Sequence, residues 1–178
     1  MKDNRKEFIF VIGKSEGMDQ ERMLKGFNSL VECQKKIKDE SIYTLVFFND
    51  DYKESCSGKS MREMRKYNAL SYKPKGRSAL LDAMGYSMDL VGERLANTPE
   101  EEMPNQVCMI IIGEDDNAST VYDYDRVSEM ISVQKYVYKW DFVFYGDGKI
   151  SFDINKGGNI ADVEKMFKDI NNYMCDIR

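Results

Sequence analysis

The chain has 178 residues, and 26 lysines and arginines stand against 31 aspartates and glutamates, so its formal net charge is −5. This length fits one domain, which we place at residues 1–178, and the acidic balance argues against a nucleic-acid partner, which would require a basic surface. The sequence contains no histidine, which excludes Ser-His-Asp and Cys-His catalysis as well as HExxH zinc sites.

The ends and the cysteines indicate a cytoplasmic protein with no membrane partner. Residues 1–7 are charged and lack the apolar core of a signal peptide. The longest apolar run, Val107–Ile112, is far shorter than the ~20 residues that cross a bilayer. The four cysteines form no CxxC pair, so we expect reduced thiols and no zinc site; they are Cys33, Cys56, Cys108 and Cys175.

The first half of the chain alternates strands and helices. Glu7–Gly13 and Ile42–Asn49 are almost continuously apolar, which is typical of strands buried on both faces. Between them, helical spacing predicts a helix over about residues 19–38, with the apolar side chains Leu24, Phe27, Leu30, Val31 and Ile37. Residues 52–75 are polar and irregular, with room for a short edge strand or a hairpin. A second helix opens at Gly76–Ser78, where Ser78 is a candidate N-cap.

The second half repeats the alternation. Val107–Gly113 and Trp140–Tyr145 are two further buried strands, and residues 124–136 form a helix between them. Apolar residues then alternate with polar ones, which predicts a half-exposed fifth strand through Ile150, Phe152 and Ile154. Asn159 is the expected N-cap of the last helix.

Alternating strands and helices predict an α/β fold with three layers: a doubly wound, mostly parallel sheet with helices on both faces. Ligands of such sheets bind beyond the carboxyl ends of the strands, near the point where the strand order reverses. The segments that leave those ends are Gly13–Met18, Gly76–Ser78 and Gly113–Ser119. We therefore expect the functional site to be built from these three loops.

The same three segments resemble the von Willebrand factor type A (vWA) domain, in particular its small stand-alone versions in bacteria and their mobile elements. FIFVIGKSEGM, at residues 8–18, is similar to the family's first strand and its metal-site loop. GRSALLDAM, at residues 76–84, is similar to the G-x-T-A-L-x-D-A helix start, and IIIGEDDNAS, at residues 110–119, to the T-D-G-x-x-N-A-S turn. The resemblance covers about residues 7–146 and implies the same Rossmann-like fold.

In that family the three loops form a metal-ion-dependent adhesion site. Two serines and a threonine coordinate Mg²⁺, two aspartates hold it through water, and a carboxylate of the protein partner completes the shell, as suits a hard cation that prefers oxygen ligands. Here the pattern is broken, so the resemblance implies a degenerate site. The corresponding positions hold Gly13 for the first aspartate, Ser15 and Gly17 for the serines, Ser78 for the threonine, and Gly113 or Ile112 for the last aspartate.

The loss of both aspartates is a large electrostatic change. A unit charge ~5 Å from a divalent ion is worth several kcal/mol, so Mg²⁺ binding should leave the useful range unless other acids replace the lost ones. The available acids are Glu114, Asp115 and Asp116. Lys14 and Arg77 lie beside former ligand positions, and either side chain could take the place of the cation.

We therefore expect a non-enzymatic protein-interaction module without metal or cofactor, whose unidentified protein partner binds at the rim formed by the three loops. The alternative is a divalent-cation-dependent protein binder that uses Glu114 or Asp115 as rearranged ligands. A third possibility, a phosphate-handling hydrolase using Asp115 or Asp116, lacks a visible nucleophile–base pair. The residues assigned to the rim are Gly13, Lys14, Ser15, Gly17, Arg77, Ser78, Gly113, Glu114 and Asp115.

Overall fold

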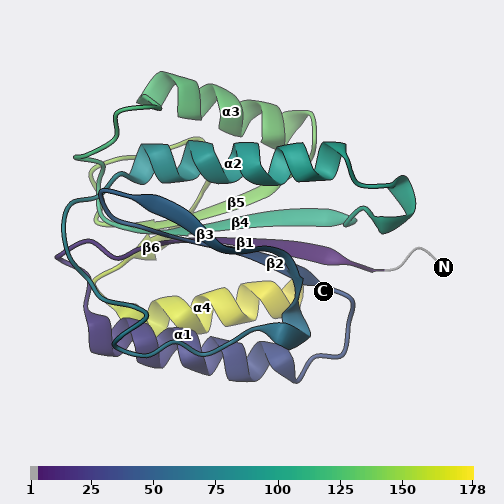
Figure 1. The fold of residues 1–178 in the computed structure, drawn as a ribbon, viewed down its shortest axis with the longest axis horizontal. Helices are drawn as coiled ribbons and strands as arrows, with labels where there is room; N and C mark the ends of the chain where they lie inside the picture. Colours follow the sequence, from purple (N-terminus) through teal and green to yellow (C-terminus); the bar gives the residue numbers. More distant parts are fainter. Residues whose placement is uncertain (1–3) are drawn as a thin grey trace.

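The computed structural model describes residues 4–178, so the first three residues of the charged segment 1–7 lie outside the described part of the chain. A central sheet is covered by two helices on each face (Figure 1). Helices α1 (Gln20–Lys35) and α4 (Val163–Asp176) lie on one face, and α2 (Leu80–Ala96) and α3 (Tyr124–Tyr136) on the other. No helix among the described residues has the length and apolar character to cross a bilayer.

The sheet has six strands in the order β3-β2-β1-β4-β5-β6. Every neighbouring pair is parallel except β2 and β3, which are antiparallel. This confirms the predicted α/β class, with a mostly parallel sheet and helices on both faces. The strand bounds are β1 Lys6–Gly13, β2 Ile42–Phe48, β3 Tyr52–Ser60, β4 Gln106–Ile112, β5 Asp141–Gly146 and β6 Asn155–Asn159.

Strand β1 lies in the middle of the sheet and feeds both halves of the core. Phe8, Phe10 and Ile12 join the apolar cluster under α1 and α4, whereas Ile9 and Val11 join the cluster under α2 and α3. All five are at most 1% exposed. Because successive side chains of a strand point to opposite faces, a strand covered on both sides is apolar over most of its length, which is how β1 could be identified in the sequence.

Two short 3₁₀ helices, η1 (Met61–Glu63) and η2 (Glu100–Glu102), complete the fold. The edge strand expected within residues 52–75 is β3, which pairs with β2. Residues 64–75 then run along α1 toward the start of α2 (Figure 1).

The predicted strand through Ile150, Phe152 and Ile154 is wrong, because β6 begins only at Asn155. The three side chains instead pack from a loop against the apolar cluster under α2 and α3. Phe152 stacks on Tyr124 with ring centroids 5.4 Å apart. Their alternation reflects this packing and not strand pairing.

Both predicted N-caps are also wrong. The N-cap of α2 is Ala79, which makes no side-chain capping bond. The N-cap of α4 is Asp162, whose carboxylate accepts from the backbone N–H of Lys165 at 3.1 Å. Asn159 ends β6 and accepts from the N–H of Ala161 at 2.7 Å, so it forms the turn before the helix.

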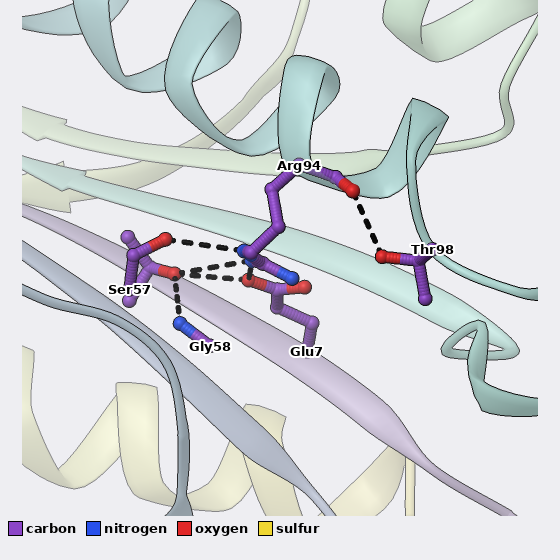
Figure 2. Close-up of polar contacts among 6 residues, drawn as sticks. Glu7, Ser57, Gly58, Arg94 and Thr98 are labelled. Atoms are coloured by element: carbon purple, nitrogen blue, oxygen red, sulfur yellow. Dashed lines mark hydrogen bonds and ion pairs between the residues drawn. The ribbon is translucent and has the colours of Figure 1, made fainter.

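An ion pair between Arg94 and Glu7 ties α2 to the beginning of β1 (Figure 2). Arg94 of α2 pairs with Glu7 of β1, which is fully buried. The hydroxyl of Thr44 donates to the same Glu7 oxygen at 2.9 Å, and Arg94 Nε donates to Ser57 Oγ at 3.1 Å. Burial raises the pKa of Glu7, although the guanidinium of Arg94 opposes this shift.

Candidate functional site

The three predicted loops do meet at the carboxyl ends of the central strands. The N–H of Glu16, after β1, donates to the carbonyl of Gly76 at 2.9 Å. The N–H of Asn117, after β4, donates to the carbonyl of Ser78, also at 2.9 Å. The loop before α2 is therefore held between the other two loops by backbone bonds, and the rim is a continuous structure.

Glu114, in the loop after β4, is hydrogen-bonded to both of the other loops of the rim. The hydroxyl of Ser15 donates to Glu114 Oε1 at 2.5 Å, and the N–H of Gly17 donates to the same oxygen at 3.1 Å. The hydroxyl of Ser78 donates to the backbone carbonyl of Glu114 at 2.9 Å. Ser15 and Ser78 are 2% and 1% exposed. Both hydroxyls that the resemblance assigns to a cation thus bond to Glu114.

The glycine at position 17 is what allows the carboxylate of Glu114 to come this close. A Cβ atom at this position would lie 2.3 Å from Glu114 Oε2, which is well inside van der Waals contact. A serine here, as in the family's pattern, would collide with the carboxylate in its observed position. The replacement of serine by Gly17 and the inward turn of Glu114 are therefore mutually consistent.

The other two glycines of the rim lie where the strands approach one another. A Cβ atom at Gly13 would lie 3.2 Å from the Cα of Gly113. A Cβ atom at Gly113 would lie 2.6 Å from Cζ of the Phe48 ring. The phenol of Tyr72 donates to the carbonyl of Gly13 at 2.7 Å. An aspartate at position 113 would therefore need the Phe48 ring to move.

Asp115 points away from Ser15 and toward the loop between β5 and β6. Its Oδ1 accepts from the N–H of Ile150 at 2.9 Å, and its own N–H donates to Asp147 Oδ2 at 3.3 Å. Burial, and then the hydrogen-bonded carboxyl group of Asp147, raise the pKa of Asp115. The structure therefore places Asp115 in a carboxyl pair with Asp147, beside the rim and outside the contacts of Glu114.

Asp116 and Asn117 supply the polar contacts at the start of α2. Asp116 Oδ1 accepts from the N–H of Leu81 at 3.2 Å, and Asn117 Oδ1 accepts from the N–H of Ser78 at 2.8 Å. The first N–H groups of a helix lack partners within the helix. Here Asp116, more than thirty residues away in sequence, provides the partner of the Leu81 N–H. Asn117 accepts from Ser78, just before the N-cap, and the hydroxyl of Ser78 donates to Glu114.

The two basic residues of the rim do not act alike. The guanidinium of Arg77 pairs with Asp50, with Nε 2.9 Å from Oδ1, and its side chain is 67% exposed. Arg77 therefore does not enter the place expected for a cation. The backbone of Lys14 bonds to the carbonyl of Phe48 at 2.7 Å and to the N–H of Lys75 at 2.9 Å, so this residue links the rim to the neighbouring loop.

Asp82 is a structural centre of the site that sequence reasoning missed. It lies on α2, is 2% exposed, and accepts backbone N–H bonds of 2.8–3.0 Å from Thr120, Val121 and Tyr122. A carboxylate with several backbone donors is well stabilised in a buried position. The signal was present, because Asp82 is the one acid within the apolar stripe of GRSALLDAM. Within residues 4–178 there is no group of three or more Cys, Asp or Glu side chains arranged to hold a metal ion.

Comparisons with known proteins rest on structure, because no family model and no curated protein matches this sequence. A variant of the PilB minor pilin of Streptococcus sanguinis superposes with a TM-score of 0.58 over 96% of this chain, at 11% identity. Proximal thread matrix protein 1 of the mussel byssus gives 0.59 over 97%, at 13% identity. Manganese-loaded TRAP of Plasmodium vivax, a protein of the vWA type, gives 0.55 over 92%, at 14% identity.

The fold is vWA-like. At identities of 11–14% this likeness concerns the fold alone. The chain spans 61%, 46% and 62% of the lengths of these three proteins. The vWA resemblance inferred from the three loop motifs is thereby supported at the level of fold.

Proposed function

We propose that this chain is a non-enzymatic protein-interaction module of the vWA type, with a degenerate adhesion site that binds its partner without a metal ion. Adhesion or protein interaction is the kind of role that its vWA-like neighbours suggest. The partner contacts the rim of the three loops, through hydrogen bonds and shape. Location in the cytoplasm and a relationship to the small bacterial and mobile-element domains belong to the same proposal.

The observation that carries the proposal is the position of the Glu114 carboxylate. In the family's pattern, serine and threonine hydroxyls face a cation, and the partner supplies a carboxylate. Here a carboxylate of the chain itself accepts from Ser15 and from the N–H of Gly17. The Glu114 carboxylate thus supplies a hydrogen-bond acceptor to the Ser15 hydroxyl and the Gly17 N–H, and these two donors need no cation nearby. TRAP, by contrast, was solved loaded with manganese.

The test is affinity capture of partners with the purified chain, quantified by mass spectrometry, in EDTA and in Mg²⁺. The triple variant Ser15→Ala, Ser78→Ala, Glu114→Ala should lose the partner that the wild-type chain captures in both buffers. A matched control, Glu129→Ala on the exposed side of α3, should retain it. Retention of the partner by the triple variant, once circular dichroism shows it to be folded, would assign binding to another surface.

The alternative function is cation-dependent binding. The position of Glu114 favours it, because among Glu114, Asp115 and Asp116 only Glu114 contacts Ser15. Calorimetric titration of EDTA-stripped protein with Mn²⁺ separates the two functions. We expect no binding heat from the wild-type chain. The variant Gly13→Asp, Glu114→Ala returns a carboxylate to β1 and frees the Ser15 hydroxyl, and is the positive comparison. Micromolar binding by the wild-type chain would make the cation-dependent function the better one.

The absence of enzymatic activity is part of the same proposal. Asp115 and Asp116 each accept hydrogen bonds from backbone N–H groups, which favours a structural role over that of a nucleophile. We expect no turnover of generic phosphoesters with or without Mg²⁺. Turnover that Asp115→Asn abolishes would contradict this expectation.

A further inference from the structure

Positive charge is concentrated in one segment of this acidic chain. Residues 59–77 contain seven lysines and arginines and one glutamate, which gives the segment a net charge of +6. Since the whole chain carries −5, the remaining residues carry −11. All seven basic residues of this segment, which we call the basic strap, are exposed: Lys59, Arg62, Arg65, Lys66, Lys73, Lys75 and Arg77.

The strap is a fixed structure. It leaves β3, runs along α1 and reaches the start of α2 (Figure 1). Asn28 of α1 exchanges two hydrogen bonds with the backbone of Tyr67, of 2.8 and 2.9 Å. Gln20 of α1 donates to the carbonyls of Ala69 and Tyr72, at 3.1 and 2.8 Å. The basic side chains of the strap therefore extend from an ordered backbone, which lowers the entropic cost of binding a partner.

A shallow groove lies where the strap crosses the end of α1. Its floor includes Val31 and Met64, both buried, and its walls carry four cations and one acid. The acid, Glu32, is paired with Lys66. The other three cations, Lys35, Lys36 and Arg65, are exposed. The groove thus offers positive walls to a ligand, while Val31 and Met64 beneath them are 1% and 0% exposed and contribute almost no apolar surface.

The strap also presents Leu70, the most exposed large apolar side chain among the described residues, at 88%. The turn around it is closed by Asn68, whose Oδ1 accepts from the N–H groups of Leu70 and Ser71 at 2.9 and 3.1 Å. An aliphatic side chain held out from an ordered turn is a candidate anchor for a protein partner, whereas phosphate groups would gain little from it.

We propose that the basic strap and its groove bind an acidic, aliphatic-containing segment of a protein partner. Carboxylates of the segment pair with Lys35, Lys36 and Arg65, and an aliphatic side chain of the segment packs against the exposed Leu70 of the strap. Exposed aromatic rings, on which bases of single-stranded nucleic acid stack, are missing from the strap, since Tyr67 is half-buried and Tyr72 is buried. This inference rests on the proposed interaction function and specifies that the protein partner carries an acidic segment with aliphatic residues.

The experiment uses a displayed library of random short peptides, selected on the wild-type chain. The enriched peptides should be rich in Asp and Glu and contain aliphatic residues. Their affinity, measured by fluorescence anisotropy, should fall by about tenfold or more in the groove variant Lys35→Glu, Lys36→Glu, Arg65→Glu, because three exposed ion pairs become repulsions. The charge-matched control Lys25→Glu, Lys139→Glu, Lys156→Glu should lose less than about twofold. Leu70→Asp should also weaken binding, by several-fold.

Peptides without acidic bias, or equal losses in the groove variant and its control, would overturn the inference. So would an oligouridine that binds the groove more tightly than any selected peptide, since it would assign the surface to nucleic acid. The rim variant with Ser15, Ser78 and Glu114 replaced by alanine separates this inference from the proposed function. If a captured partner is lost from the rim variant but kept by the groove variant, the rim function stands and the strap inference is wrong.

Discussion

The Oγ atom of Ser15 and the Oε1 atom of Glu114 lie 2.5 Å apart, although the two residues are 99 positions apart in the chain. This hydrogen bond joins the loops that follow β1 and β4, two neighbouring parallel strands. The Glu114 carboxylate thereby accepts hydrogen bonds from both the Ser15 hydroxyl and the nearby N–H of Gly17. The Glu114 side chain therefore adds a direct link between the loops after β1 and β4 to the backbone bonds that hold the loop before α2.

Replacing Glu114 should measurably destabilise the chain. Glu114→Ala removes the acceptor of the buried Ser15 hydroxyl and of the Gly17 N–H, and we expect a loss of about 1–3 kcal/mol in the free energy of unfolding. Glu114→Gln keeps an acceptor oxygen and should lose less than half as much. Urea unfolding at neutral pH measures both. The exposed neighbour Glu16→Ala should change stability by less than about 0.5 kcal/mol, and a similarly small effect of Glu114→Ala would contradict the prediction.

Gly17 and Glu114 should be energetically coupled. Gly17→Ala places a methyl group on the carboxylate, whose flexible side chain has to swing away from Ser15. In the wild-type background we expect a loss of about 1–2 kcal/mol, since the donors lose their acceptor. In the Glu114→Ala background the same substitution should be neutral or slightly stabilising, because alanine restricts the unfolded chain. A double-mutant cycle by urea unfolding measures the difference. Additive effects would show that the two residues do not share the contact.

The Asp115–Asp147 pair should give a measurable pH dependence. The pKa of Asp115 is raised above 3.8 in the folded chain, so folding favours its protonated form. The stability gained from this proton is fully present below the unfolded pKa and is lost as the pH rises through the folded pKa. Lys149 opposes the shift in pKa. Asp147→Asn removes the second carboxyl group, so it should become stabilising relative to wild type as the pH rises from about 4 to about 7.

Urea unfolding of wild type and Asp147→Asn across this pH range checks the prediction, together with an NMR titration of the Asp115 carboxyl group. The exposed Asp176→Asn on α4 controls for the loss of one charge, and its difference from wild type should stay flat. A difference for Asp147→Asn that does not change with pH would show that the two carboxyl groups titrate independently.

The Arg94–Glu7 pair should respond unequally to removal of either partner (Figure 2). Arg94→Met leaves a fully buried carboxylate without its counter-charge, and we expect a loss of about 3–5 kcal/mol near pH 7. Glu7→Gln should cost less than half of this, because the Arg94 side chain is 28% exposed and reaches solvent. The raised pKa of Glu7 means that protonation relieves the buried charge, so the loss in Arg94→Met should shrink as the pH falls toward about 5.

Urea unfolding of both variants at about pH 5 and about pH 7 provides the measurement. Thr98→Ala, which removes only a bond to the backbone carbonyl of Arg94, serves as a control and should lose about 1 kcal/mol at both pH values. Equal losses for Arg94→Met and Glu7→Gln would indicate that burial of Glu7 is not what makes the pair costly to break.

The elements that the sequence predicted well are those whose residues are constrained locally. β1, β2, β4 and β5 are apolar over most of their length because helices cover both faces of the sheet. The failures have a different origin. Ile150, Phe152 and Ile154 alternate because they pack on a core built by other elements, and the start of α2 is served by Asp116 and Asn117 from a distant loop.

The candidate site shows the same division. The order of the loops and their meeting at one edge followed from the sequence, because parallel strands bring their carboxyl ends together. The choice among Glu114, Asp115 and Asp116 did not follow, because all three lie in one acidic turn. Only the tertiary structure placed Glu114 against Ser15, Asp115 against Ile150 and Asp116 against α2.

The sequence by itself determined the α/β class, the positions of the buried strands and the loops that form the rim. Hydrophobic periodicity encodes these features within short windows of the chain. The tertiary structure decided which acid contacts Ser15, why position 17 is glycine and where the basic strap lies along α1. These depend on contacts between residues far apart in the chain, such as the 99 positions between Ser15 and Glu114, and distances of that kind are set by packing and not by local pattern.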